Sequence, residues 1–457
     1  MLKTRLFRHA AFIAGASLLA ACGGGSDSSD TSYSEAYIQF YNGSSNSPST
    51  ELYLDSDFLG ASSYGDATSL FTLDSGNGEF SLLWEDADGT ETTVSELELN
   101  LRNGYKTLLM MTGDFDDPDI SEFQFERSEL EDQFYLYALS SLNDGSSFDL
   151  YISEEGAPFS EANFVLNLNY LDFQQGQYWN AVDDAFAWDE GDYVLYLTNP
   201  GEQEVIFESQ AIGFDFSTDY VLVVRNTTGA NDSNLVIDVI LNSTNITANQ
   251  DVEATSQFRV YSALSEDREL DITLTADSTE SYEQTVSGGE LSDFTTVTFG
   301  DYQITAQDNS DVSAGFNNRL LTLNQGASKT ILIFEDENQS LTSIEVTDST
   351  LPQTFEHEVN IANLLPEFAE VDIYFVRDDE TIETADYKTT SLDYADARSI
   401  TLPNDYYSIV VVYEDNLGTD TLLYRSEVLD FTSDDVLMIT VEADVDVGTG
   451  YRARLLQ

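Results

Sequence analysis

Short runs of apolar residues, separated by turn-forming residues, extend along most of the chain. The runs are rich in Val, Ile, Leu, Tyr and Phe and often alternate with polar residues, while Gly, Asn, Asp and Ser stand between them. Alternation with a period of two is typical of strands that turn one face to a core. No long stretch follows the helical period, and the chain has only seven prolines. The pattern predicts a nearly all-β protein.

Three signatures recur four times in the same order, which indicates an internal repeat. The first places an acidic residue inside a strand, at 51–54, 149–152, 271–274 and 372–375. The second is a turn residue that leads into an aromatic strand, at 78–82, 191–195, 300–304 and 405–409. The third is a late apolar strand, at 104–109, 219–224, 328–333 and 435–439. The second signature advances by roughly 105 to 115 residues per copy, the size of one small sandwich domain.

We therefore expect four tandem immunoglobulin-like β-sandwich domains. The predicted boundaries are 34–128, 130–247, 255–349 and 354–457. The aromatic residue two places after each turn, such as Tyr302, is expected to face the core and bury a large apolar area. Because the connectors between the copies are short and polar, they predict a semi-rigid row of separate domains.

The repeat resembles the bacterial domain of unknown function 4397, an immunoglobulin-like β module found in tandem on exported proteins. Residues 365–374, Leu-Pro-Glu-Phe-Ala-Glu-Val-Asp-Ile-Tyr, are similar to that family's Pro-Asp-Ala-Pro-x-Val-Asp-Val-Tyr motif. Residues 103–108, followed by Thr112 and Gly113, are similar to its Gly-x-Tyr-Thr-Leu strand. Copies two and three lack the proline, and copy two carries an insertion around 174–188. The resemblance implies the fold and transfers no catalytic residue.

Residues 1–21 have the layout of an export signal peptide. Lys3, Arg5 and Arg8 precede an apolar stretch from 10 to 21, which is too short to span a bilayer that requires roughly 20 residues. The sequence Leu-Ala-Ala-Cys at 19–22 resembles the lipobox of bacterial lipoproteins, in which the cysteine is lipidated and the preceding segment is removed. The resemblance implies that the chain is anchored to a membrane by lipid.

The rest of this region supports the same interpretation. Cys22 is the only cysteine, and a lone exported thiol needs a partner or a modification; a cleaved signal with a leftover cysteine is the alternative. Gly23 stands where an aspartate would favour retention in the inner membrane, so we expect the outer membrane. The Gly-, Ser- and Asp-rich segment 22–33 is predicted to be a flexible tether.

The composition is strongly acidic but apolar enough for folding. The 457 residues are 41% hydrophobic and 12% aromatic, whereas disordered chains are less apolar. With 84 Asp and Glu against 17 Lys and Arg, the net charge is −67. Phosphate binding requires clustered Lys and Arg, so nucleic-acid partners are not expected. An acidic surface suits a saline, halophilic habitat, and a dedicated role in cation binding is the alternative.

Few residues of the sequence favour catalysis. His357 is the only histidine after the signal peptide, and we interpret it as a surface or strand residue and not as the base of a serine hydrolase. With Cys22 lipidated, zinc sites built from Cys and His are excluded. No glycine-rich phosphate loop is present. We therefore expect no enzymatic activity; a carboxylate pair that hydrolyses glycosides is the alternative.

Calcium is the only cofactor that the sequence suggests, because it binds six to eight oxygen atoms and favours clustered aspartates. Two predicted loops carry such clusters, and the simpler interpretations are an Asp-Gly hairpin turn for the first and solvated charge for the second. The candidate ligands are Asp86, Asp88, Asp114, Asp116, Asp117 and Asp119.

Three aromatic residues in the insertion of copy two are candidates for stacking on sugars. These residues are Tyr178, Trp179 and Trp188. Exposed rings would be available to a glycan, whereas buried rings would be part of the core.

The sequence therefore predicts a non-catalytic, lipid-anchored protein of the bacterial cell envelope, whose β-sandwiches form a structural or binding stalk. Adhesion and assembly with other envelope proteins or glycans are the expected roles, on the periplasmic face or the cell surface. The alternatives are a calcium-dependent or carbohydrate-binding adhesive module and an envelope glycoside hydrolase.

Overall fold

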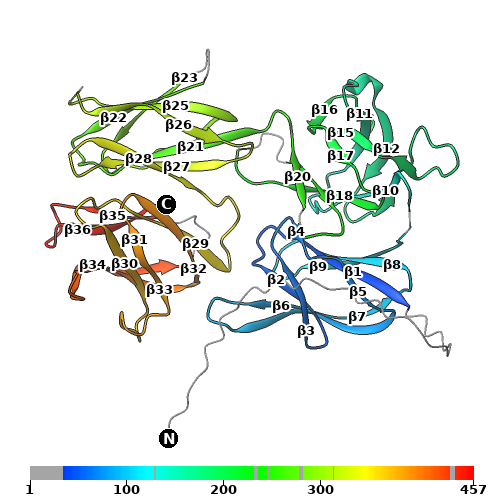
Figure 1. Cartoon of the computed structure of the whole chain (residues 1–457), viewed down its shortest axis with the longest axis horizontal. Helices are drawn as coiled ribbons and strands as arrows, with labels where there is room; N and C mark the ends of the chain where they lie inside the picture. Colours follow the sequence, from blue (N-terminus) through cyan, green and yellow to red (C-terminus); the bar gives the residue numbers. More distant parts are fainter. Residues whose placement is uncertain are drawn as a thin grey trace, which may run out of the picture.

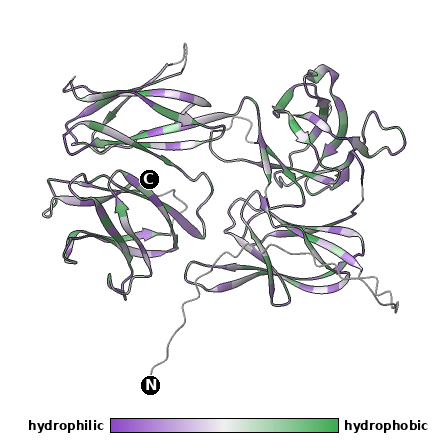
Figure 2. Ribbon diagram, viewed as in Figure 1, coloured by the Kyte–Doolittle hydropathy of each residue, from purple (hydrophilic) through white to green (hydrophobic). Residues whose placement is uncertain are grey.

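The computed structural model describes residues 34–127, 130–230, 235–244, 246–276, 281–311, 313–432 and 438–456. Within these ranges the chain forms strands and one short 3-10 helix, η1 (Phe159–Glu161), and no α-helix. Figure 2 shows hydrophobic and hydrophilic residues alternating along the strands. The nearly all-β prediction is confirmed. The predicted signal peptide, Cys22 and the predicted tether lie outside the described residues.

The first two copies each form two sheets. In domain 1, one sheet contains β1 (Glu35–Gly43), β4 (Asp66–Ala67), β5 (Phe71–Asp74), β8 (Tyr105–Thr112) and β9 (Asp119–Glu126). The other sheet contains β2 (Thr50–Leu54), β3 (Asp57–Ser62), β6 (Gly76–Glu85) and β7 (Glu91–Leu101). In domain 2, one sheet contains β10 (Gln133–Ser140), β13 (Gln174–Gln175), β14 (Ala187–Asp189), β18 (Asp219–Asn226), β19 (Leu235–Ile240) and β20 (Thr247–Gln250). The other sheet contains β11 (Phe148–Glu154), β12 (Asn163–Leu168), β15 (Gly191–Thr198), β16 (Val205–Glu208) and β17 (Ile212–Phe214). The second domain thus extends past residue 247, because β20 completes its sheet.

The last two copies are more regular, with four strands in each sheet. In domain 3, one sheet contains β21 (Thr255–Ser262), β24 (Thr295–Thr298), β27 (Ser328–Glu335) and β28 (Leu341–Thr347). The other sheet contains β22 (Glu269–Thr275), β23 (Ser281–Ser287), β25 (Gly300–Asp308) and β26 (Gly315–Leu323). In domain 4, one sheet contains β29 (Glu356–Asn363), β32 (Asp396–Pro403), β35 (Met438–Ala443) and β36 (Tyr451–Leu456). The other sheet contains β30 (Glu370–Val376), β31 (Tyr387–Asp393), β33 (Asp405–Glu414) and β34 (Asp420–Phe431).

All four domains share one topology. The first strand of each copy (β1, β10, β21, β29) pairs in parallel with its late strand (β8, β18, β27, β35). We call the sheet that contains this parallel pair the first sheet. The second sheet is antiparallel in every copy. Each domain has its own core between its two sheets, as a tandem β-sandwich requires.

The three repeated signatures fall on equivalent strands. The first lies on the second strand of each copy and the second on the strand paired with it, while the described part of the third lies on the late strand. The predicted inward aromatic residues Phe80, Tyr193, Tyr302 and Tyr407 are all buried in the cores. The alternation of the sequence therefore places the largest side chains correctly.

The domains do not form a row but pack in two pairs (Figure 1). Domain 2 lies above domain 1, and domain 3 above domain 4, in the view of Figure 1. The first sheets of domains 1 and 2 share an apolar cluster, which includes Leu108, Met110, Val221 and Val223. Leu332 and Met438 belong to the corresponding cluster between domains 3 and 4. The expected row of separate domains is wrong, because the first sheets bury both of their faces.

A tyrosine–carboxylate–arginine contact is embedded in each pair. The Tyr41 hydroxyl donates a hydrogen bond to Asp238 Oδ2 at 2.7 Å, and Arg225 forms a salt bridge with the same carboxylate. The Tyr261 hydroxyl donates to Glu442 Oε2 at 2.8 Å, and Arg452 pairs with that carboxylate. The two pairs are therefore built on one plan.

Candidate functional site

A polar cavity lies where domains 1 and 2 meet the connector that precedes domain 4. Strands β1 and β8 are parallel, so the loops after Gly43 and Thr112 leave the sheet at the same edge. In domain 2, the loops after Ser140 and Asn226 do the same. The pairing of the two first sheets brings these four loops around one cavity of about 570 Å³.

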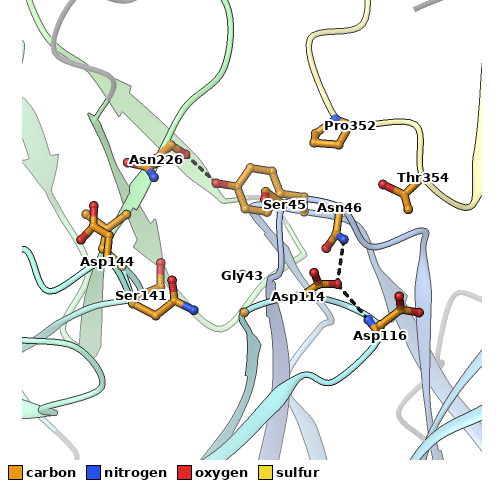
Figure 3. Close-up of a pocket in the computed structure, with 14 residues that line it drawn as sticks. Gly43, Ser45, Asn46, Asp114, Asp116, Ser141, Asp144, Asn226, Pro352 and Thr354 are labelled. Carbon is orange, nitrogen blue, oxygen red and sulfur yellow. Dashed lines mark hydrogen bonds between the residues drawn. The ribbon is translucent and has the colours of Figure 1, made fainter. Parts of the chain in front are cut away.

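Residues from all three segments line this cavity. Figure 3 shows Pro352 and Thr354 across the cavity from Ser141 and Asp144. The lining residues are Gly43, Ser45, Asn46, Tyr64, Gly113, Asp114, Asp116, Ser141, Leu142, Asn143, Asp144, Asn226, Pro352 and Thr354. We call this the central cavity.

Hydrogen bonds between the loops fix the shape of the central cavity. Asn46 Nδ2 donates to Asp114 Oδ1 at 3.0 Å, and Asn46 Oδ1 accepts from the backbone N–H of Phe115 (Figure 3 shows the first of these bonds). The Tyr64 hydroxyl of domain 1 donates to the carbonyl of Asn226 in domain 2. The cavity walls are thus held together before any ligand binds, which lowers the entropy that binding would cost.

The central cavity is negatively charged. Its described lining contains three aspartates and no Lys, Arg, His or Cys. Hydrogen bonds from the Asn46 side chain and the Asp116 backbone lower the pKa of Asp114. Hydrogen bonds from Ser146 lower the pKa of Asp144. Both carboxyl groups therefore stay ionised near neutral pH, and the lining suits a cationic or hydroxyl-rich ligand.

The predicted acidic loop contributes only partly to this cavity. Asp114 and Asp116 line it, whereas Asp119 accepts a hydrogen bond from the Tyr170 hydroxyl of domain 2 at 2.7 Å. The backbone N–H of Asp117 donates to the carbonyl of Asp114, which makes a turn. Among the described residues, no group of three or more His, Cys, Asp or Glu side chains is arranged to hold a metal ion.

The other acidic segment forms the β6–β7 hairpin turn and contacts domain 4. Asp86 accepts a hydrogen bond from the backbone N–H of Thr90 at 2.8 Å within the turn. Both oxygens of Asp88 accept hydrogen bonds from Arg377, each at 2.9 Å, and Asp88 Oδ1 also accepts one from the Tyr387 hydroxyl. A calcium ion at Asp88 would have to displace this contact, and calcium at these residues stays a prediction.

Aromatic rings continue the contact between domains 1 and 4 as far as the central cavity. Phe355 of the connector packs edge-on against Phe115 and Trp84. Its ring centroid lies 5.0 Å from that of Phe115 and 5.7 Å from that of Trp84. Phe115 lies between the cavity residues Asp114 and Asp116, and Phe355 follows Thr354. This contact between domains 1 and 4 therefore borders the central cavity. We call it the clasp; its residues are Trp84, Asp88, Phe115, Phe355 and Arg377.

The insertion of domain 2 is a structural element, which corrects the sugar-stacking prediction for two residues. Strands β13 and β14 pair with β10 and complete the first sheet. Trp188 is fully buried and its Nε1 donates to the Gly176 carbonyl, and Tyr178 is also buried in the core. Enclosed rings present no face to a sugar, so only the half-buried Trp179 retains an accessible edge.

His357 lies in β29 and is buried, so the strand interpretation is correct and the surface alternative is wrong. Its ring faces Phe431 with the centroids 6.3 Å apart. His357 follows the cavity-lining Thr354 by three positions but does not itself line the cavity.

Sequence patterns did not identify most of the cavity. Residues such as Ser45, Asn46, Asn143 and Asn226 lie on loops, and only the packing of two domains brings them together. One signal was present: the late strands have continuous apolar runs, Leu108 to Met111 and Val221 to Val224, which are typical of strands buried on both faces. Comparison with protein-family models and with curated proteins gives no match for this chain.

We expect Asp88→Ala to loosen the clasp. The change removes three hydrogen bonds to domain 4, but Asp88 is 37% exposed, so the loss of free energy is about 1 kcal/mol. Spin labels at Thr92→Cys and Thr421→Cys, in a Cys22→Ser chain, should give a broader distance distribution. Leu417, which is 90% exposed at the equivalent turn of domain 4, supplies the control variant Leu417→Ala. Identical distributions in both variants would show that the clasp does not hold the domains together.

Proposed function

We propose that this chain is a non-catalytic, lipid-anchored binding protein of the bacterial cell envelope. The observation that carries the proposal is the central cavity, whose walls come from two domains and a connector and are held by hydrogen bonds. A preformed concave site with convergent polar groups is typical of ligand-binding sites. The compact two-pair arrangement favours a binding head over an extended stalk.

The chemistry of the cavity favours binding over catalysis. A glycosidase needs one carboxylic acid with a raised pKa, in order to protonate the leaving group. The pKa values of Asp114 and Asp144 are instead lowered by their hydrogen bonds. Phosphate-containing partners such as nucleic acids are also disfavoured. The ionised carboxylates repel phosphate, and the described lining contains no Lys or Arg that would attract it.

The proposed anchor rests on the sequence of residues 19–22. The described residues include no helix that is long and apolar enough to cross a membrane. Lipid on Cys22 would hold the folded domains at the outer membrane through several acyl chains. Expression of the full chain in a bacterial host with radiolabelled palmitate should label the wild-type protein in the membrane fraction. Cys22→Ser should lose the label and leave that fraction; a labelled Cys22→Ser chain would contradict the anchor.

A glycan is the candidate ligand, because its hydroxyl groups suit an anionic, amide-rich lining. A calcium ion is the alternative, since cations also suit this lining, but the described carboxylates form no group arranged to hold a metal ion. We expect the purified full chain to bind members of an envelope-glycan array, or to unfold at a higher temperature in CaCl₂ than in NaCl of equal ionic strength. Asn143→Ala should weaken either effect because Asn143 lines the cavity, whereas Asn338→Ala, in an exposed turn of domain 3, should not. If neither probe binds, or if both variants behave alike, the cavity is not the binding site.

A further inference from the structure

A lysine is fully buried in the contact between domains 1 and 2. Lys106 lies on β8 and is 0% exposed. Its Nζ donates hydrogen bonds to the side-chain oxygen of Asn242, at 3.1 Å, and to the carbonyl of Leu241, at 3.3 Å. Both acceptors are neutral and belong to domain 2. The amine of one domain thus lies against the carboxamide of the other.

The surroundings of Lys106 are apolar and favour the uncharged amine. The ring of Phe125 lies 5.8 Å from Nζ, and the neighbouring side chains form the apolar cluster between the two domains. Burial lowers the pKa of Lys106 to about 7, although Asp219 opposes this shift. Burial likewise raises the pKa of Asp219 to about 6. Near neutral pH, a large fraction of Lys106 is therefore a free amine, which is a nucleophile.

The carboxamide of Asn242 is held in place. Its Nδ2 donates to Thr218 Oγ1 at 2.9 Å, and the next carbonyl, of Ser243, accepts a hydrogen bond from Gln39 of domain 1 at 3.2 Å. Because a carbonyl bond is about 1.23 Å long, Lys106 Nζ lies at most about 4.3 Å from the carbonyl carbon of Asn242. Groups that a folded protein holds in contact have a high effective concentration once the reacting atoms approach to about 3–3.5 Å, and a small rotation of either side chain supplies this approach.

We propose that Lys106 and Asn242 join in an intramolecular isopeptide bond that links domain 1 covalently to domain 2. The lone pair of Nζ forms a bond to Cγ of Asn242, and the bond from Cγ to Nδ2 breaks. One proton passes from Nζ to the departing Nδ2, which leaves as ammonia. No oxidant, reductant or further reactant is required, and the product is a secondary amide.

Asp219 is the carboxyl group that we assign to the proton transfer. It is buried, it follows Thr218, whose hydroxyl accepts the hydrogen bond from Asn242 Nδ2, and its own Oδ1 is buried without a hydrogen-bond partner among the described residues. Arg127 is the other charged group that acts on both Lys106 and Asp219. The ionised carboxylate of Asp219 accepts the proton from Nζ and passes it to Nδ2, so Asp219 is unchanged when the ammonia has left. The new amide does not react again, and the step therefore occurs once per chain.

The mass of the protein tests the bond directly. Isopeptide formation lowers the mass of the full chain by about 17 Da, the mass of ammonia. Trypsin cannot cleave after an acylated lysine, so peptide 103–127 should stay whole and be linked to peptide 226–259. Lys329 is the internal control: it lies on the corresponding strand of domain 3, pairs with Glu345 at 2.8 Å, and should be cleaved normally.

Variants separate this bond from other reactions of Asn242. Cyclisation of Asn242 with Ser243 also releases ammonia but gives no linked peptides and does not need Lys106. Lys106→Met, which keeps a long apolar side chain, and Asn242→Ala should both have the mass calculated from their sequences, with no loss of ammonia. Asp219→Asn should greatly slow the loss of ammonia. Peptides 103–106 and 107–127 in the wild-type digest, or ammonia loss that persists in Lys106→Met, would overturn the proposal.

Discussion

Asp238→Ala is expected to lower the free energy of unfolding by about 3–5 kcal/mol. The carboxylate is buried at the contact of domains 1 and 2, where it accepts hydrogen bonds from the Tyr41 hydroxyl and from Arg225. Its removal leaves the Arg225 charge largely buried without its partner, and the cost of an unpaired buried charge dominates. Urea unfolding followed by tryptophan fluorescence, which reports on Trp84 of domain 1 and on Trp179 and Trp188 of domain 2, measures the change.

A second variant distinguishes the unpaired charge from lost packing. The triple change Tyr41→Phe, Arg225→Met and Asp238→Leu removes all three polar groups at once, and it should recover most of the lost stability because apolar replacement of a buried ion pair is often neutral. Asp336→Ala, in an exposed turn of domain 3, is the control for the loss of a carboxylate. A cost below about 1 kcal/mol for Asp238→Ala would mean that the two domains are not packed as described.

Trp188→Ala is expected to cost about 3–5 kcal/mol, because it leaves a large cavity in a well-packed core. The ring contacts Phe134, Tyr178 and Tyr193 and exposes none of its surface. The truncation also removes the hydrogen bond from its Nε1 to Gly176. Thermal unfolding followed by circular dichroism measures the effect on the full chain.

Trp179→Ala is the matched control, because this neighbouring ring is only half-buried and packs on the edge of the same core. We expect its cost to be about half that of Trp188→Ala or less. Equal stability of the wild-type and Trp188→Ala chains would contradict the core position of Trp188 and would restore its interpretation as a sugar-stacking residue.

Local patterns predicted the domains well. Turn residues followed by an aromatic position marked the same strand in all four copies, and Phe80, Tyr193, Tyr302 and Tyr407 are buried there. Alternation with a period of two depends only on neighbours along the chain, so a single sequence contains it. The burial of Trp188 was less evident, because an insertion rich in aromatic residues fits a core strand and an exposed loop equally well.

The packing of the domains was not predicted, because it depends on residues far apart in the chain. Tyr41 and Asp238 are 197 positions apart, and nothing local marks them as partners. The central cavity has the same origin. Asn46 and Asn143 meet only after the first sheets of domains 1 and 2 have paired, and Pro352 joins them from the connector before domain 4. Asp114 and Asp116 were selected as a calcium loop for their density of charge, and their place at a cavity follows from the arrangement of the domains.

The arrangement of the four domains in two packed pairs is the claim on which the cavity, the clasp and the isopeptide bond all depend. Small-angle X-ray scattering of the full chain in solution tests it most directly. We expect a radius of gyration of about 22–25 Å for the folded part, close to that of a compact chain of this length. A value of about 40 Å, as for four domains of about 13 Å radius of gyration in a row, would contradict the account.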